Sequence, residues 1–69
     1  MPNWFSVQNN LPAMQDTDFG AWVSAVVHVK CGDMVLDAYL DRGRDGKLRW
    51  RDDETGAMLK NVSEWSHLD

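Results

Sequence analysis

The chain has 69 residues, of which 43% are hydrophobic and 26% charged, and eleven acidic against seven basic side chains give it a net charge of −4. This length allows a single domain, residues 1–69, and the composition argues against disorder over most of the chain. The moderate acidity opposes non-specific binding to nucleic acid and favours solubility.

The first twenty residues are expected to form one short strand and a covering segment. Residues 4–7 are short and aromatic and predict an edge strand, which ends before Pro12 because proline removes a backbone donor. Residues 13–20 show little apolar periodicity and are predicted as a loop with room for a short helical turn. Because one face of so small a sheet needs a cover, we expect residues 4–20 to provide it.

Residues 21–41 predict a hairpin. The clearest strand is residues 21–30, since its four valines suit a pleated surface. Gly32 is expected to supply a positive φ in the tight turn that follows, and residues 34–41 alternate as the return strand. Alternation in the first strand places four side chains on one face: Val23, Ala25, Val27 and Val29.

The second half of the chain continues the same pattern. Asp45-Gly46 is among the strongest hairpin signals, and residues 47–52 alternate cleanly after it. Residues 53–56 predict a third turn, and residues 62–67 a last strand or a final turn. The fold class is therefore mostly β, with α+β left open: a small antiparallel meander of four to five short strands with an N-terminal covering segment.

Four tryptophans are spread along the chain, at positions 4, 22, 50 and 65. Each indole can bury roughly 150–250 Å², and a chain this short otherwise has difficulty covering a core. We therefore expect the tryptophans to hold the domain together rather than to form a binding platform.

Several short motifs recur in one known family. The opening Trp4-Phe5-Ser6-Val7 with Leu11-Pro12, the central Ala38-Tyr39 and Trp50, and the closing pair Val62 and Trp65 resemble a small domain family of unknown function carried by phages, prophages and enterobacterial genomes. The resemblance implies a compact β-rich domain of mobile-element origin and no known activity. The chain departs from that family at Phe5, where Ile or Val is common, and at its end, which lacks the family's proline-containing tail.

No residue pattern predicts catalysis, a metal site or a cofactor. His28 and Cys31 lie three positions apart, which on a strand directs them to opposite faces. A single cysteine excludes a multi-cysteine metal site, and residues 41–46 lack the ligand spacing of a calcium loop. Because no motif for catalysis is present, we expect a non-enzymatic protein. No apolar run approaches the roughly 20 residues that cross a bilayer, so we expect it to be cytoplasmic.

The acidic side chains suggest a binding function. We predict a partner-binding acidic patch of four residues: Asp37, Asp52, Asp53 and Glu54. Such a patch fits a basic surface on a host protein or defence complex. Small size, acidity and the phage resemblance together favour an inhibitor of a bacterial defence nuclease complex, of the anti-CRISPR or anti-restriction kind. The alternative is that the acidic residues have no binding role and only keep the domain soluble.

A basic stretch supports the alternative of a nucleic-acid-binding module. It contains five of the seven bases: Arg42, Arg44, Lys47, Arg49 and Arg51. Alternating bases on a strand project from one face and can contact phosphates. Acidic residues flank the stretch closely, however, so pairing of these bases across the sheet with Asp37 and Asp41 is the favoured interpretation. Whether the protein is a monomer or a homodimer is left open.

Overall fold

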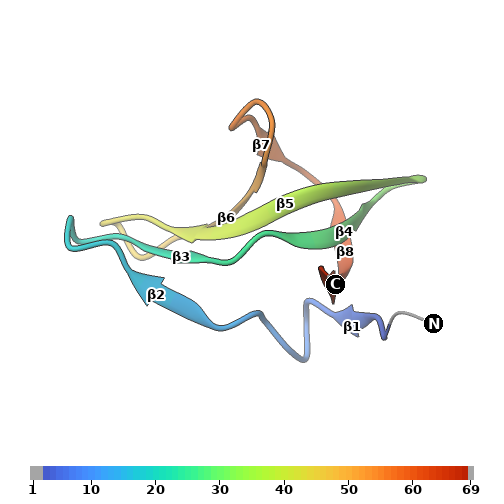
Figure 1. Ribbon diagram of the computed structural model, residues 1–69, viewed down its shortest axis with the longest axis horizontal. Helices are drawn as coiled ribbons and strands as arrows, with labels where there is room; N and C mark the ends of the chain where they lie inside the picture. The colour runs from blue at the N-terminus through green and yellow to red at the C-terminus, as the bar shows by residue number, and fades with distance from the viewer. Residues whose placement is uncertain (1–2, 69) are drawn as a thin grey trace.

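The computed structural model describes residues 3–68, which form eight strands and no helix. The strands are β1 (Phe5–Ser6), β2 (Met14–Asp16), β3 (Trp22–Ser24), β4 (Val27–Cys31), β5 (Met34–Arg42), β6 (Leu48–Asp52), β7 (Met58–Leu59) and β8 (Val62–His67). All strand pairings are antiparallel and belong to one curled sheet (Figure 1). The predicted mostly β class is confirmed. The strands outnumber the expected four or five because four of them are only two or three residues long.

Strand β5 is the centre of the sheet. Ala38 pairs with Val27 of β4 on one edge of β5 and with Asp52 of β6 on the other. Beyond β4, strand β3 continues along the same edge, with Trp22 opposite Arg42. The strand order is β1-β8-β4-β5-β3-β2, and β6 and β7 extend the sheet from the opposite edge of β5.

The strand predicted over residues 21–30 is divided in two. Ala25 and Val26 lie outside any strand and separate β3 from β4, so Ala25 is exposed rather than in the core, whereas Val27 and Val29 are buried as expected. The buried Ser24 stabilises the break, because its Oγ accepts a hydrogen bond from the Leu40 N–H at 2.9 Å and donates one to the Ala25 carbonyl at 2.8 Å. A side chain thus replaces the missing ladder partner of Leu40.

The N-terminal segment both covers a face and lengthens the sheet. The prediction of a loop over residues 13–20 is wrong in part, because Met14–Asp16 forms β2 and pairs with β3. Strand β1 pairs with β8 and β2 pairs with β3, and the segment between them, the N-terminal crossing, runs past the Trp65 side chain (Figure 1). Pro12 is buried in this crossing, and the carbonyl of Asn10 accepts a hydrogen bond from Trp65 Nε1 at 2.9 Å.

The core lies where β4, β5 and β8 meet. Val27, Val29, Ala38 and Trp65 form its buried cluster, and Trp50 packs half-buried against it. The expectation that all four tryptophans hold the core is wrong for Trp22, which is 36% exposed on β3 and, like Trp4, is not among the residues that form the core cluster or pack against it. Trp22 and Trp65 both lie on strands with neighbours on each side, so the difference follows from their place along the sheet. Trp65 lies beside Val29 in the core cluster, whereas Trp22 lies opposite Arg42 at the far end of β5.

The turns and the last strand follow the sequence pattern. Gly32 adopts a φ of 60° between β4 and β5, and Gly46 a φ of 80° between β5 and β6. A side chain is strained in that left-handed region, which glycine enters freely. Residues 62–67, predicted as a strand or a turn, are strand β8.

Candidate functional site

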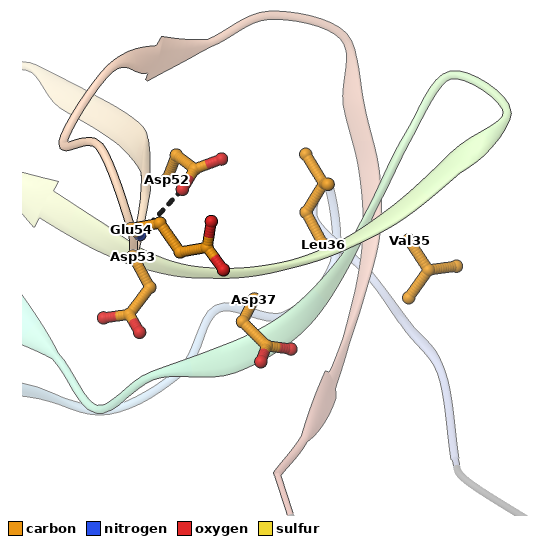
Figure 2. A pocket seen from close by; sticks show the side chains of 6 residues that line it. All are labelled: Val35, Leu36, Asp37, Asp52, Asp53 and Glu54. Carbon is orange, nitrogen blue, oxygen red and sulfur yellow. Dashed lines mark hydrogen bonds between the residues drawn. The ribbon is translucent and has the colours of Figure 1, made fainter.

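The four residues of the predicted acidic patch lie around one pocket. This pocket, of about 290 Å³, is lined by Val35, Leu36, Asp37, Asp52, Asp53 and Glu54. The turn that follows β6 brings residues 52–54 against the N-terminal half of β5 (Figure 2). Asp37 and Asp53 point the same way from their strand and turn, whereas Leu36 points to the other side of β5 (Figure 2). The name acidic patch is kept for Asp37, Asp52, Asp53 and Glu54.

Local hydrogen bonds fix the position of the acidic patch. Asp52 Oδ1 accepts hydrogen bonds from the N–H groups of Glu54 at 2.7 Å and Thr55 at 3.3 Å, the arrangement typical of an Asx turn. The Asp53 N–H donates to the Asp37 carbonyl at 3.0 Å and joins the turn to β5. Asp52 therefore shapes the turn, while the Asp53 and Glu54 side chains are exposed to solvent.

The charge of the acidic patch is only partly compensated. Asp37 Oδ1 lies 2.9 Å from His28 Nδ1, the one imidazole near the patch within residues 3–68. The ion pairs formed by the described residues do not include Asp52, Asp53 or Glu54. Negative charge thus accumulates where the turn after β6 meets Asp37 of β5.

Two arginines of the basic stretch are neutralised by neighbouring carboxylates. Arg51 Nε donates to Asp41 Oδ2 at 3.0 Å, so the predicted pairing across the sheet with Asp41 is confirmed. Arg49 Nη2 donates to Asp45 Oδ2 at 2.7 Å, and this bond raises the pKa of Arg49 and lowers the pKa of Asp45. The predicted pairing with Asp37 is wrong, because Asp37 faces His28 on β4 instead.

The other bases of this stretch do not form one continuous surface. Arg44 Nε donates to the Phe19 carbonyl at 2.7 Å, which ties the β5–β6 turn to the β2–β3 loop. The Arg42 guanidinium lies 5.3 Å from the centre of the Trp22 ring, a cation–π contact. Lys47 is exposed just before β6. The stretch is therefore split among separate contacts.

A second, apolar groove of about 370 Å³ opens between β6, β7 and the N-terminal crossing. Its lining includes the exposed side chains of Leu11, Leu48 and Met58. Leu48, the first residue of β6, is 48% exposed, whereas Trp50 two positions later is half-buried.

His28 and Cys31 do not approach each other in an arrangement that would activate a nucleophile. Cys31 Sγ donates to the Lys60 carbonyl at 3.0 Å, whereas His28 faces Asp37. Across residues 3–68, no group of three or more His, Cys, Asp or Glu side chains is placed to hold a metal ion.

Sequence reasoning missed the two apolar members of the pocket, Val35 and Leu36. Their alternation with Asp37 and Ala38 was visible, but it marks them as ordinary strand residues. Their place in the pocket depends on where β6 ends relative to β5, and that is a property of the hairpin register.

Comparison of the chain with protein-family models, with curated proteins and with solved structures finds no match. No helix among residues 3–68 is long and apolar enough to cross a membrane. The fold and the acidic patch are therefore the basis for assigning a function.

Proposed function

We propose that the protein acts without catalysis, by binding a basic surface of a partner protein through the acidic patch. One observation carries this proposal: four carboxylates surround a single pocket, and within residues 3–68 three of them have no ion pair. By contrast, Arg49 and Arg51 are already paired with Asp45 and Asp41.

The physical argument is one of electrostatic complementarity. Several carboxylates around one pocket attract a cationic partner and accelerate its encounter with the protein. The Asx turn at Asp52 holds the neighbouring acids in place before binding, so less conformational freedom is lost in the complex.

The resemblance to phage-borne domains suggests the class of partner. We propose a host protein, in the bacterial cytoplasm, that belongs to a defence nuclease complex, as for an anti-CRISPR or anti-restriction inhibitor. Nucleases bind phosphates through grooves rich in arginine and lysine, and a fixed set of carboxylates is suited to occupy such a groove. The competing proposal is direct nucleic-acid binding by residues 42–51, and the exposed Lys47 is its main support.

Affinity capture from bacterial lysate, with nuclease added, separates these proposals. The tagged protein is compared with the charge-neutral variant Asp53→Asn/Glu54→Gln and with the matched control Arg42→Gln/Lys47→Gln. The captured partner is then purified and titrated against all three. We expect the acidic-patch variant to lose about tenfold or more in affinity, equivalent to about 1.4 kcal/mol, and the control to bind within about twofold of the original.

Capture that disappears when nuclease is added, or that is lost in Arg42→Gln/Lys47→Gln and kept in Asp53→Asn/Glu54→Gln, would reject the acidic patch as the binding surface. It would transfer the function to the basic stretch and nucleic acid.

A further inference from the structure

The β4–β5 hairpin leaves one sheet edge open beside the acidic patch. Residues 34–37 of β5 pair with β4 on one side, but the pairing of β5 with β6 begins only at Ala38. Among residues 3–68 no strand pairs with this first half of β5 on the β6 side. Figure 1 shows the hairpin projecting past the end of β6.

The backbone of this open edge is oriented to accept another strand. The Asp37 carbonyl points toward the β6 side, since it accepts the hydrogen bond of Asp53 N–H at 3.0 Å. In an antiparallel ladder, alternate residues direct both backbone groups to the same edge. The N–H and C=O of Val35 therefore point the same way as Asp37, into the open edge.

Open strand edges are usually protected by lysines, prolines or bulges. This edge carries none of these, and the side chains of Met34 and Val35 are 60% and 58% exposed. The pocket of about 290 Å³ lies along the edge, with Val35, Leu36 and Asp37 on the β5 side.

The negative charges of the acidic patch determine which kind of strand can pair with this edge. A second copy pairing through the same edge would bring two acidic patches together, and like charges on neighbouring strands are destabilising. A cationic strand has the opposite effect. Side chains of an added strand alternate between faces, so one set would lie beside Asp37 and Asp53 and the other beside Leu36 (Figure 2).

We propose that the protein binds an extended, lysine- or arginine-containing segment of its partner as an added β-strand along residues 34–37, with the cationic side chains toward Asp37 and Asp53. This inference rests on the proposed function and specifies how that same site binds. Backbone hydrogen bonds to Val35 supply the pairing, and the acidic patch selects basic side chains.

A pair of synthetic peptides tests strand addition directly. The ¹⁵N-labelled protein is titrated with an acetylated hexapeptide of alternating lysine and valine. The control is the same hexapeptide with its lysine backbone amides N-methylated, which keeps the charge but lacks the N–H groups that would point at β5 when the lysine side chains lie beside Asp37. We expect the lysine–valine peptide to shift and protect the Val35 amide, and to bind at least tenfold more tightly than the control.

Equal affinity for the two peptides, lost in Asp53→Asn/Glu54→Gln, would overturn strand addition and retain the acidic patch as a charged contact surface. No change at the Val35 amide with either peptide at millimolar concentration would also overturn strand addition. The proposed function would then still be decided by the lysate capture and its matched variants.

A protein variant provides a second test. Val35→Pro removes the N–H at the open edge and leaves the hydrogen bonds of Leu36 to β4 in place, while Val35→Thr keeps the N–H. We expect Val35→Pro to weaken binding of the lysine–valine peptide at least tenfold and Val35→Thr to bind within about twofold. If circular dichroism shows that Val35→Pro is unfolded, two lysine–valine peptides replace it, one N-methylated at the lysine amides and one at the valine amides, which point away from β5. Equal affinity of these two peptides would overturn the inference.

Discussion

Trp65 joins the two ends of the described chain. Its indole is 2% exposed, its ring centre lies 4.9 Å from that of Phe5 on β1, and its Nε1 donates to the Asn10 carbonyl. The same side chain therefore fills the core and anchors the N-terminal crossing.

We expect Trp65→Ala to destabilise the protein by about 3–5 kcal/mol, the usual cost of removing a buried aromatic side chain, which is enough to unfold a domain of this size. Trp22→Ala is the matched control, because its ring is 36% exposed, lies outside the core cluster and contacts Arg42, so we expect a smaller loss than for Trp65→Ala. Urea unfolding followed by circular dichroism measures both. Equal losses in the two variants would contradict the assignment of Trp65 to the core.

The Asp45–Arg49 pair gives the β5–β6 turn a defined pH response. The hydrogen bond from Arg49 holds the pKa of Asp45 below its ordinary value of 3.8. A carboxyl whose pKa is lowered by folding stabilises the protein above its unfolded-state pKa, and that stabilisation is lost as the pH falls through the lowered value.

Asp45→Asn should therefore reduce stability slightly at pH 7, where the original carboxylate is ionised, and the difference from the original protein should shrink below a pH of about 4. The pair is exposed to solvent, so the effect at pH 7 should also decrease at high salt. Urea unfolding at pH 7 and at pH 3 checks both trends. A difference that grows toward acid pH would mean that the pair does not stabilise the turn.

At the scale of the strands, the break between β3 and β4 depends on one buried hydroxyl. Ser24→Ala leaves the Leu40 N–H without its hydrogen bond in a buried position, which we expect to cost about 1–3 kcal/mol. Ser63→Ala is the control, because Ser63 is exposed on β8, and its effect should stay within about 0.5 kcal/mol. Thermal unfolding of the two variants makes the comparison. A neutral Ser24→Ala would show that water or a backbone shift satisfies Leu40.

The local signals for strands and turns in this chain were readable from the sequence. Alternating residues predicted most of β5 and β6, and Gly32 and Asp45-Gly46 predicted their turns, since turn chemistry is a property of a few adjacent residues. The break at Ala25 was not readable, because the valine run continues through it and the hydrogen bond that stabilises it joins Ser24 to Leu40, sixteen positions apart. Strand β2 was missed because its three residues have almost no pattern of their own and depend on pairing with β3.

The grouping of the four acidic-patch residues was predictable because it depends on neighbouring positions in the sequence and on one hairpin. Asp52, Asp53 and Glu54 are consecutive, and the hairpin places Ala38 opposite Asp52, which brings Asp37 to the same turn. The open edge beside it could not be predicted, because it depends on the different lengths to which β4 and β6 pair with β5.

At the scale of the molecule, stability should be highest at the centre of the sheet and lowest at its margins. Amides that point from β4 and β5 into their shared ladder, such as those of Val29 and Ala38, should exchange with solvent most slowly, at rates set by global unfolding. Amides of β2 and β7 should exchange through local opening. The Val35 amide should exchange quickly although its neighbours are protected. Hydrogen exchange followed by NMR measures all of these, and strong protection of Val35 in the free protein would show that the edge is not open.

The pairing of β1 with β8 limits how fast the chain can fold. Phe5 pairs with Trp65, sixty positions along the chain, and Trp65 in turn lies beside Val29. The hairpins around β5 need only short loops, but this last contact requires closure of nearly the whole described chain before any of its contacts are gained. Proteins dominated by such distant pairings fold slowly, on a timescale of milliseconds to seconds. Until β8 pairs with β4, Val27 and Val29 are not covered by Trp65 and its neighbours. A ribosome-bound chain whose residues 62–67 are still inside the exit tunnel should therefore have a partly formed, aggregation-prone sheet.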